Sequence, residues 1–415
     1  MREMKNSGVA WVGAMPEDWT VKRGKFTLKL LNRPVKDTDD VITCFRDGEV
    51  TLRTNRRTDG FTFSVKEIGY QGIETGDLVI HGMDGFAGSI GISDSRGKSS
   101  PVLVVCDTDE NKRYIMYYLR SMAYNNVFTA LSTGIRVRSC DLRWNKLAEL
   151  PYILPSFIEQ DKIVSAIESS TSKVDVLIAN VQAQIEKLKA YKQSLITEVV
   201  TKGLDPNAPM KDSGVEWIGT IPTAWNTVRV KQLLKERKER SSDGKEEPLP
   251  MSQKVGLVPT KMLGAIPNMA STFVGAKLTH VDDLVFNKLK AHLGVFSVSK
   301  YDGLVSPDYA VYYSTGVANL KYLEYLFKTP QCISEFRKRS TGIAAGLTRL
   351  YTEGLFAIEC PLPPKKEQHR IVLYLNEKCA QIDKLTAIKQ TKIEKLEQYK
   401  RSLIYEYVTG KKEVV

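Results

Sequence analysis

The sequence predicts two similar mixed α/β domains joined by two long helices that pair as an antiparallel coiled coil. The first observation is an internal repeat, because residues 7–13 return as residues 213–219 in this 415-residue chain. The second is that residues 156–202 and 365–409 contain neither proline nor glycine. The rest of each repeat holds short β-like runs bounded by turn residues. This is a duplicated domain with a connector, since solenoid repeats have periods of about 20–50 residues.

The repeat extends through both halves of the chain. Trp225 repeats Trp19 at an offset of 206 residues, and after an insertion of two residues the offset becomes 208, as for Glu159 and Glu367. The duplication predicts an internal pseudo-two-fold axis and a molecule that holds two equivalent partners or sites. The predicted segments are a first domain at residues 1–155, a central spacer helix at 156–203, a linker at 204–212, a second domain at 213–362 and a C-terminal spacer helix at 363–415.

Each predicted domain contains both strands and helices. Residues 77–80 and 102–105 are β-like, whereas residues 112–122 and 319–339 are predicted to be helical. Within the central spacer, residues 169–172 are serine or threonine, which favours a break into a short and a long helix.

Both spacer segments carry one apolar seam at spacings of three and four residues, which is typical of a coiled coil. About 35 helical residues form a rod of roughly 50 Å, and such a seam requires a partner. We expect each helix to pair with its duplicate, because folding of each helix onto its own domain would not explain so long a seam. The seam residues are Val174, Ile178, Val181, Ile185, Leu188 and Leu195 in the first helix, and Ile382, Leu385, Ile393, Leu396 and Leu403 in the second.

The net charge of +12 is compatible with nucleic acid as a partner, although each predicted domain is only mildly basic. The first residues do not read as a signal peptide, and no apolar run approaches the ~18 residues of a membrane span. Six scattered cysteines and four unpaired histidines indicate neither a disulfide framework nor a metal site. We therefore expect a cytoplasmic protein with reduced thiols and no membrane contact.

Signals of catalysis are weak. Residues 91–99 are similar to a phosphate-binding loop but have five residues between the glycines, where that loop needs four. A turn between strands is the better interpretation. Pro307 and Asp308 are not followed by the acidic and lysine residues of a nuclease site. The sequence therefore predicts no catalytic residue and no metal ligand.

Basic clusters are the better candidates for function, since Arg and Lys contact phosphates and Arg reads guanine edges. Any single cluster is also compatible with an ordinary solvated surface. The candidate DNA-binding residues are Arg53, Arg56, Arg57, Arg136 and Arg138 in the first half, and Lys288, Lys290, Arg337, Lys338 and Arg339 in the second.

Two motifs together carry a family resemblance. One is the Ser-Gly-Val-x-Trp-x-Gly-x-x-Pro-x-x-Trp opening of each half. The other is Leu362-Pro363-Pro364 before Glu367-Gln368, which leads into a long helix that ends in Ser-Leu-Ile-x-Glu-x-Val-Thr. Duplicated, they resemble the specificity subunit of bacterial type I restriction-modification enzymes over essentially the whole chain.

This resemblance implies that each globular domain is a target recognition domain and that the chain itself is non-catalytic. It implies double-stranded DNA, two methyltransferase subunits and two restriction (translocase) subunits as partners. S-adenosylmethionine, ATP and Mg²⁺ would be bound by those partners, and this chain would bind no cofactor. Because residues 32–75 and 238–281 show almost no identity, the two half-sites should differ, so the target should be bipartite and asymmetric.

Two alternatives remain open from the residues. The chain could be a coiled-coil adaptor that tethers two identical partners without reading DNA, which DNA footprinting with the methyltransferase would distinguish. It could instead be a nucleotide-dependent enzyme built on residues 91–99, which would show ATPase activity in the isolated chain.

Overall fold

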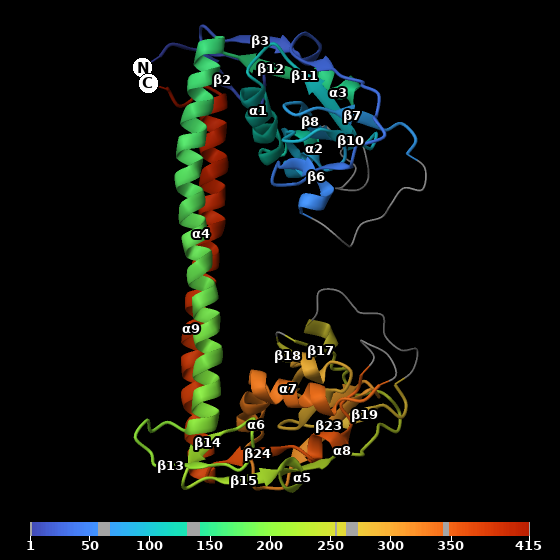
Figure 1. The fold of residues 1–415 in the computed structure, drawn as a ribbon, viewed down its shortest axis with the longest axis vertical. Coiled ribbons are helices and arrows are strands. Elements are labelled where there is room, and N and C mark those ends of the chain that lie inside the picture. Colours follow the sequence, from blue (N-terminus) through green and yellow to red (C-terminus); the bar gives the residue numbers. More distant parts are fainter. Residues whose placement is uncertain are drawn as a thin grey trace. The chain divides into compact units, whose positions relative to one another are not determined.

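The computed structural model describes residues 2–56, 67–130, 142–253, 255–262, 273–342 and 348–414. The chain forms two compact units, one made of Met1–Gln182 and Gln390–Val415 and the other of Ala183–Lys389. Each unit contains one globular domain and part of each long helix, α4 (Phe157–Lys202) and α9 (Lys365–Val408) (Figure 1). Among the described residues, no helix combines the length and the apolar character that a bilayer crossing requires.

The globular domain of the first unit is built around a four-stranded antiparallel sheet. Its strands follow the order β4 (Lys29–Leu30), β11 (Leu103–Asp107), β8 (Leu78–His81) and β9 (Ile90–Ile92). Four strand pairs lie around it: β1 (Met4–Asn6) with β2 (Ala14–Pro16), β3 (Thr20–Arg23) with β12 (Pro151–Leu154), β5 (Ile42–Cys44) with β6 (Val50–Leu52), and β7 (Gln71–Ile73) with β10 (Gly97–Ser99). Its helices are α1 (Lys112–Tyr124), α2 (Val127–Ala130) and α3 (Trp144–Glu149), with 3-10 turns η1 (Gly24–Phe26), η2 (Arg53–Asn55) and η3 (Gly85–Ala87).

The globular domain of the second unit repeats this topology. Its four-stranded sheet has the order β16 (Leu234–Glu236), β23 (Tyr309–Ser314), β20 (Leu284–Asn287) and β21 (Phe296–Val298). The strand pairs are β13 (Met210–Asp212) with β14 (Thr220–Pro222), β15 (Asn226–Arg229) with β24 (Glu359–Leu362), β17 (Met251–Ser252) with β18 (Gly256–Leu257), and β19 (Lys277–Thr279) with β22 (Gly303–Val305). The helices are α5 (Val230–Leu233), α6 (Leu320–Phe327), α7 (Pro330–Arg339) and α8 (Thr352–Phe356), with 3-10 turns η4 (Thr260–Met262) and η5 (Ala291–Leu293).

The predicted helix at residues 112–122 is confirmed as α1, but the helix predicted over residues 319–339 is wrong in its continuity. The structure has two helices there, α6 and α7, because Pro330 occupies the first turn of α7. Proline lacks the N–H that a continuing helix needs and clashes with the preceding turn. The Thr329 side chain accepts a hydrogen bond from the Cys332 amide and caps the new helix. Residues 91–99, as expected, hold the turn between β9 and β10.

Each hydrophobic core joins a globular domain to the ends of both long helices. In the first unit, Trp19 and Tyr152 pack with Ile163 of α4 and Val408 of α9. In the second unit, Trp225 and its neighbours pack with Val200 of α4 and Ile371 of α9. In each unit, therefore, one core holds the globular domain against the segments of the two long helices that belong to that unit.

The same polar contacts fix the start of each long helix. The Trp19 indole N–H donates to Glu159 at 3.1 Å, and the Trp225 indole donates to Glu367 at 2.9 Å. The buried Gln160 accepts from the Asn111 amide, as Gln368 accepts from the Asn319 amide. The Trp and Glu-Gln motifs of the repeat are therefore structural, since they lock each domain to the helix that leaves it.

Ion pairs set the register of the two helices within each unit. In the first unit, Lys400 of α9 lies 2.7 Å from Asp175 of α4. In the second, Lys192 of α4 lies 2.7 Å from Asp383 of α9. Both pairs obey the 208-residue offset of the repeat. The helices therefore run antiparallel inside each unit, with a lysine at one seam position of each.

Burial follows the predicted seam with one exception. Leu385 is 48% exposed, because the spacing that runs from Ile382 to Ile393 places Thr386 and Lys389 at the half-buried positions. Leu385 is therefore corrected to a flanking position. The buried seam residues are Val174, Val181, Ile185, Leu195, Ile382, Ile393 and Leu403, and the half-buried ones are Ile178, Leu188 and Leu396.

The expected break at residues 169–172 is absent, because α4 is continuous from Phe157 to Lys202. Thr171 is 6% exposed and occupies a seam position, and its hydroxyl donates to the Glu168 carbonyl. Burial of this position and the local hydrogen bond outweigh the weak helix propensity of serine and threonine.

Candidate nucleic-acid interface

The basic residues predicted in the first half lie beside the β5–β6 hairpin. Arg56 follows η2, and its guanidinium donates to Asp47 at 2.7 Å and to Glu49 at 2.8 Å. It also lies 4.1 Å from the centroid of the Phe45 ring. The hydrogen bond to Asp47 is the main cause of a raised pKa at Arg56. Two carboxylates thus balance the charge of Arg56. The primary role of this side chain is to stabilise the β5–β6 hairpin.

The other candidates of this half are less defined. Arg53 opens η2 and its Nε donates to the Thr43 hydroxyl at 3.4 Å. Arg57, Arg136 and Arg138 lie outside the described residues, so the structure leaves their assignment as a prediction.

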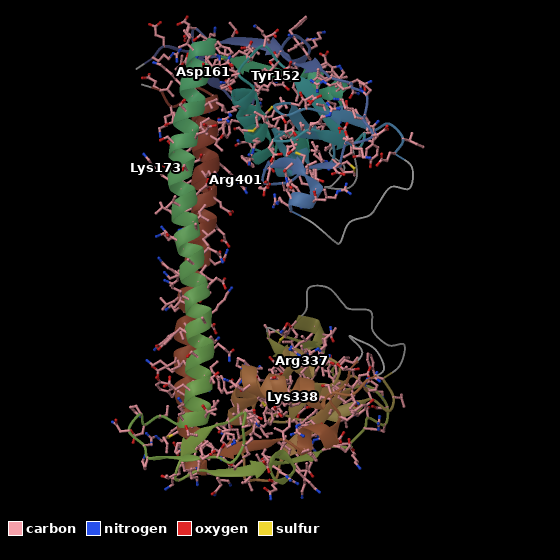
Figure 2. The ribbon with its side chains drawn as sticks, in the orientation of Figure 1. Tyr152, Asp161, Lys173, Arg337, Lys338 and Arg401 are labelled. Atoms are coloured by element: carbon pink, nitrogen blue, oxygen red, sulfur yellow. The ribbon has the colours of Figure 1, made fainter. Side chains whose placement is uncertain are left out.

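The candidates of the second half come from two elements that pack together. Lys288 and Lys290 lie in the turn between β20 and η5, and α7 packs against η5. The last turn of α7 carries Arg337, Lys338 and Arg339 (Figure 2). The structure therefore gathers residues that are separated by about fifty positions in the sequence onto neighbouring elements.

These basic side chains differ in how their charge is balanced. Lys338 lies 2.8 Å and Arg339 3.7 Å from the carboxylate of the buried Glu335. Within the described part of the chain, Lys288, Lys290 and Arg337 form no ion pair. Three uncompensated cations on adjacent elements can attract the phosphates of a nucleic acid.

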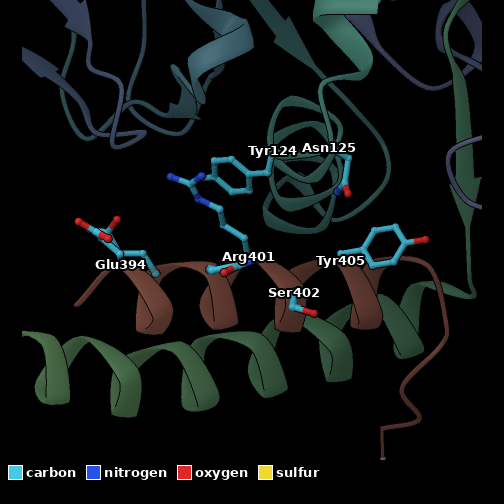
Figure 3. A pocket seen from close by; sticks show the side chains of 8 residues that line it. Tyr124, Asn125, Glu394, Arg401, Ser402 and Tyr405 are labelled. Atoms are coloured by element: carbon cyan, nitrogen blue, oxygen red, sulfur yellow. The ribbon is translucent and has the colours of Figure 1, made fainter. Parts of the chain in front are cut away.

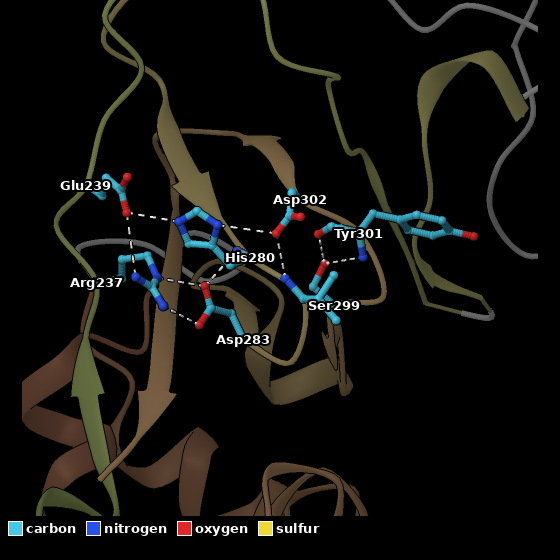
Figure 4. A network of polar contacts seen from close by, with 8 residues as sticks. Arg237, Glu239, His280, Asp283, Ser299, Tyr301 and Asp302 are labelled. Atoms are coloured by element: carbon cyan, nitrogen blue, oxygen red, sulfur yellow. Dashed lines mark hydrogen bonds and ion pairs between the residues drawn. The ribbon is translucent and has the colours of Figure 1, made fainter. Parts of the chain in front are cut away.

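A charged network supports the loops of the second domain (Figure 4). Arg237 donates to both carboxylate oxygens of Asp283, at 2.7 and 2.9 Å. His280 lies between Glu239 at 3.0 Å and Asp302 at 3.2 Å. The hydrogen bond to Glu239 is the main cause of a raised pKa at His280. The network connects the end of β19 and the start of β22 to the segment that follows β16. It is therefore a scaffold and not a reactive site.

The core of this network is repeated in the first unit. Arg33 forms a bidentate ion pair with the buried Asp77, whose carboxylate also accepts from the Glu74 amide at 2.8 Å. Asp77 and Asp283 are related by the 206-residue offset. The scaffold under the loops is therefore shared by both domains, whereas His280 and its two carboxylates belong to the second domain alone.

Sequence reasoning missed one buried lysine. Lys277 is 9% exposed, and its ammonium donates to the Tyr309 carbonyl at 2.6 Å. Burial is the main cause of its lowered pKa. Gln71, at the equivalent position, donates to the Leu103 carbonyl at 3.2 Å. Because both domains make this hydrogen bond, we assign Lys277 a structural role. The glutamine at the equivalent position of the repeat is the sequence feature from which this role could have been inferred.

A groove that the sequence did not predict lies between α1 and α9 in the first unit (Figure 3). Its volume is about 550 Å³, and Arg401 reaches over the Tyr124 ring with 5.0 Å to the ring centroid. Arg120 donates to the Tyr124 hydroxyl at 2.8 Å. Glu394 and Glu397 also line the groove and balance this charge.

Among the described residues, no group of His, Cys, Asp and Glu is placed to hold a metal ion.

Comparison with known proteins places the chain among relatives of nearly equal length. No protein-family model matches it. The putative type I restriction enzyme MjaX specificity subunit of Methanocaldococcus jannaschii is 23% identical over 426 residues, which cover 96% of this chain and 95% of the relative. The type I restriction enzyme MjaVIII specificity subunit of the same organism is 22% identical over 420 residues, with 96% and 93% covered.

A solved structure shares the fold. Its source is a study of complex assembly and conformational transition of the type I R-M system. The TM-score is 0.69 at 14% identity, with 95% of this chain and 99% of the other covered. The predicted fold class, mixed α/β domains with long antiparallel helices, is confirmed by this match and by the element order.

Proposed function

We propose that this chain, which is a type I restriction enzyme specificity subunit by its relationship to the curated subunits along nearly its whole length, recognises an asymmetric bipartite DNA target. Each globular domain reads one half-site. The chain also scaffolds two methyltransferase subunits and, in a restricting complex, two restriction subunits. The chain itself is non-catalytic, in agreement with relatives that are named as specificity subunits.

One observation carries the proposal: the same scaffold occurs twice under different loops. Both domains have a four-stranded sheet of equivalent order, and in both an arginine forms an ion pair with the aspartate that directly precedes an inner strand, β8 or β20. Duplicated readers of this kind suit two half-sites at a fixed separation, as dimeric DNA-binding proteins do.

The difference between the loops supports an asymmetric target. The second domain presents Lys288, Lys290 and Arg337, which have no ion-pair partner among the described residues, whereas Arg56 of the first domain is held by two carboxylates. In sequence, Arg136 and Arg138 of the first half correspond to Ala344 and Gly346 of the second. Different side chains on one scaffold present different hydrogen-bonding patterns to base edges.

The proposal assigns the cofactors to other subunits. S-adenosylmethionine belongs to the methyltransferase, and ATP with Mg²⁺ to the restriction subunit, so this chain contributes no cofactor site of its own. A complex that acts on chromosomal DNA works in the cytoplasm, which is the location that the proposal includes.

Methylome sequencing tests the proposal directly. A strain without other methyltransferases would express the cognate methyltransferase alone or together with this chain. We expect methylation at one bipartite sequence with two unlike halves, and only when this chain is present. Methylation at a single uninterrupted or symmetric sequence would contradict bipartite asymmetric reading. If methylation did not depend on this chain, the adaptor alternative would be favoured.

Alanine variants test the basic candidates one by one. Removing a phosphate contact by Arg337→Ala, Lys288→Ala or Lys290→Ala should weaken binding to all sequences and reduce the salt slope by about one. A base-reading residue should instead relax one position of one half-site. Lys211→Ala, on the exposed hairpin strand β13, is the matched control and should change neither. If an alanine variant kept the affinity and the salt slope of the unmodified chain, its cluster would be an ordinary solvated surface.

A further inference from the structure

One short turn occupies the same place in both domains but carries different side chains. In the first domain, residues 82–84 link β8 to η3, and in the second domain, residues 288–290 link β20 to η5. We call these segments turn 1 and turn 2, and the 206-residue offset of the repeat relates them. Turn 1 reads Gly-Met-Asp and turn 2 reads Lys-Leu-Lys. All three side chains therefore differ at an equivalent position of the scaffold.

The last residue of the preceding strand holds each turn. The His81 Nδ1 accepts hydrogen bonds from the amides of the second and third residues of turn 1, at 3.3 and 3.0 Å. The Asn287 Oδ1 accepts from the same two amides of turn 2, at 3.1 and 3.2 Å. Burial lowers the pKa of His81 below its ordinary value, so the ring is neutral at pH 7 and its Nδ1 can accept. Two different residue types thus supply one acceptor at the same place.

A buried leucine makes a third contact that both turns share. The Leu142 amide donates to the Gly82 carbonyl at 2.9 Å, and the Leu350 amide donates to the Lys288 carbonyl at 3.0 Å. These leucines are 1% and 3% exposed. Three hydrogen bonds therefore fix the backbone of each turn in both domains. A site that discriminates between ligands needs such support, because its contacting side chains must be held in place.

The surroundings of turn 2 belong to the nucleic-acid interface described above. Lys288 and Lys290 are part of the turn, and η5, which follows it, packs against the helix that ends in Arg337. In turn 1 the third residue is Asp84, which lies 3.0 Å from Arg46. The two turns therefore present opposite charges at this position on equivalent backbones. Such a difference is expected if the two domains read different bases.

The middle residue is large and apolar in both turns. Met83 is 52% exposed, and Leu289 is half-buried. An apolar side chain does not bind phosphate, but it can contact the methyl group of thymine or the face of a base. Methionine and leucine differ in length and shape, so the two residues would favour different bases. In turn 2 the flanking lysines can hold the phosphates while the middle residue contacts a base.

We propose that turns 1 and 2 are equivalent base-reading turns, in which Met83 and Leu289 contact bases and His81 and Asn287 are positioning residues. This inference rests on the proposed function and names residues through which each domain reads its half-site. A loop under no constraint would lose its hydrogen bonds as its sequence diverged. Here the three hydrogen bonds are shared while every side chain of the turn differs, as expected where a fixed backbone presents variable contacts.

Methylome sequencing with the cognate methyltransferase tests the middle residues. Met83→Ala should relax one position of one half-site, with the preference for the correct base reduced by about tenfold. Leu289→Ala should relax one position of the other half-site. Met4→Ala and Met210→Ala are the matched controls, because they change another equivalent pair, 43% and 40% exposed on β1 and β13. Neither control should alter the methylated sequence.

Conservative exchanges test the positioning residues. His81→Phe keeps a ring and Asn287→Leu keeps the side-chain size, but both remove the acceptor. Each should relax the same position as the alanine variant of its own turn. His81→Asn and Asn287→His supply the acceptor that the other domain uses, and both should keep the methylated sequence. A purely structural role would lower the melting temperature and the total methylation without changing which sequence is methylated.

The outcomes separate this inference from the proposed function. If Met83→Ala and Leu289→Ala left both half-sites unchanged, or relaxed the same half-site, the turns would not be readers and the proposed function would stand. Because Met83 is exposed, Met83→Ala should keep the melting temperature, so turn 1 decides the inference even if Leu289→Ala unfolds. If the unmodified chain directed no methylation at a bipartite sequence, the proposed function itself would be wrong.

Discussion

Tyr114 and Tyr322 show how single residues connect a domain to the end of a long helix. The fully buried hydroxyl of Tyr322 lies 3.0 Å from the Val200 carbonyl of α4 and 3.2 Å from the Pro361 carbonyl of β24. Tyr114 makes the equivalent contacts with Val408 of α9 and Ile153 of β12. Burial raises the pKa of both phenols well above its ordinary value. Each tyrosine thus stays neutral and donates where a domain strand meets a helix end.

Tyr322→Phe should destabilise the second unit. The substitution removes a buried donor and leaves carbonyl oxygens without this partner, which costs about 1–3 kcal/mol. Urea unfolding should show a lower midpoint with an unchanged slope. Tyr313→Phe is the control, because Tyr313 is 37% exposed and its hydroxyl should contribute within about 0.5 kcal/mol. Equal effects of the two changes would contradict the assigned role of Tyr322.

The charged network around His280 predicts a pH dependence of stability. Its pKa in the folded protein is raised above 6.5, chiefly by Glu239, so its stabilisation is present below pH 6.5 and is lost as the pH rises through the raised pKa. The pKa of Glu239 is lowered, chiefly by His280, and its contribution is lost as the pH falls from 4.5. Both contributions are therefore present between about pH 4.5 and 6.5.

Thermal unfolding at pH 6 and pH 8 measures this effect. The unmodified chain should lose more stability over that interval than His280→Gln, which has no group that titrates there. His369→Gln, at an exposed position on α9, should retain the full dependence. An unchanged pH profile for His280→Gln would show that the network does not stabilise the folded state.

At the scale of elements, the long helices combine an apolar seam with two ion pairs whose lysines occupy seam positions. Lys192 and Lys400 occupy seam positions with side chains that are 29% and 33% exposed, and each reaches an aspartate on the other helix. Such pairs add little stability, but a polar residue in a seam specifies register. The apolar positions supply the free energy, and the lysines select one alignment.

Ile185→Asp should disrupt the helix pair in the second unit. Ile185 is 2% exposed, so the change loses apolar packing and places a carboxylate in the seam, at a cost of about 3 kcal/mol or more. Circular dichroism during thermal unfolding should show a lower transition and loss of helix. Val176→Asp introduces the same charge at an exposed position and should have little effect. Comparable effects of both substitutions would argue against the seam.

At the scale of the whole molecule, the proposed function makes the length of the spacer decisive for the target. Adding seven residues after Val181 and seven after Lys389 would lengthen both helices by two turns and keep the seam in register. The added length of about 10 Å corresponds to about three base pairs. Methylome sequencing should find the same two half-sites with a gap that is wider by about three base pairs. Altered half-sites with an unchanged gap would contradict the spacer as a ruler.

The ends of the chain meet within the first unit, which predicts tolerance to circular permutation. The Arg2 amide donates to Glu413 at 2.9 Å, and the Tyr405 hydroxyl donates to the Trp11 carbonyl. Joining these ends with a linker of about ten residues and opening the chain between residues 205 and 209 should preserve both units. Native mass spectrometry should still find two methyltransferase copies, and the methylated sequence should be unchanged. A permuted chain that folds but binds one copy would argue against equivalent halves.

The sequence by itself determined the duplication, the fold class and most of the seam, because these depend on local spacing. Trp19 and Trp225, Glu159 and Glu367, and the heptad positions recur at fixed intervals, and periodicity alone locates them. It also indicated where basic residues cluster along the chain. Which side chains meet in space does not follow from spacing.

Tertiary structure decided which of those residues have partners. Leu385 reads as a seam residue but is exposed, since the register is set by all the seam contacts together with the Lys–Asp pairs. Arg56 reads as a free cation but is neutralised by two carboxylates from an adjacent turn. Lys288 and Arg337 are far apart in sequence and lie on elements that pack together. Charge and burial depend on contacts between distant segments, and only the folded chain defines those contacts.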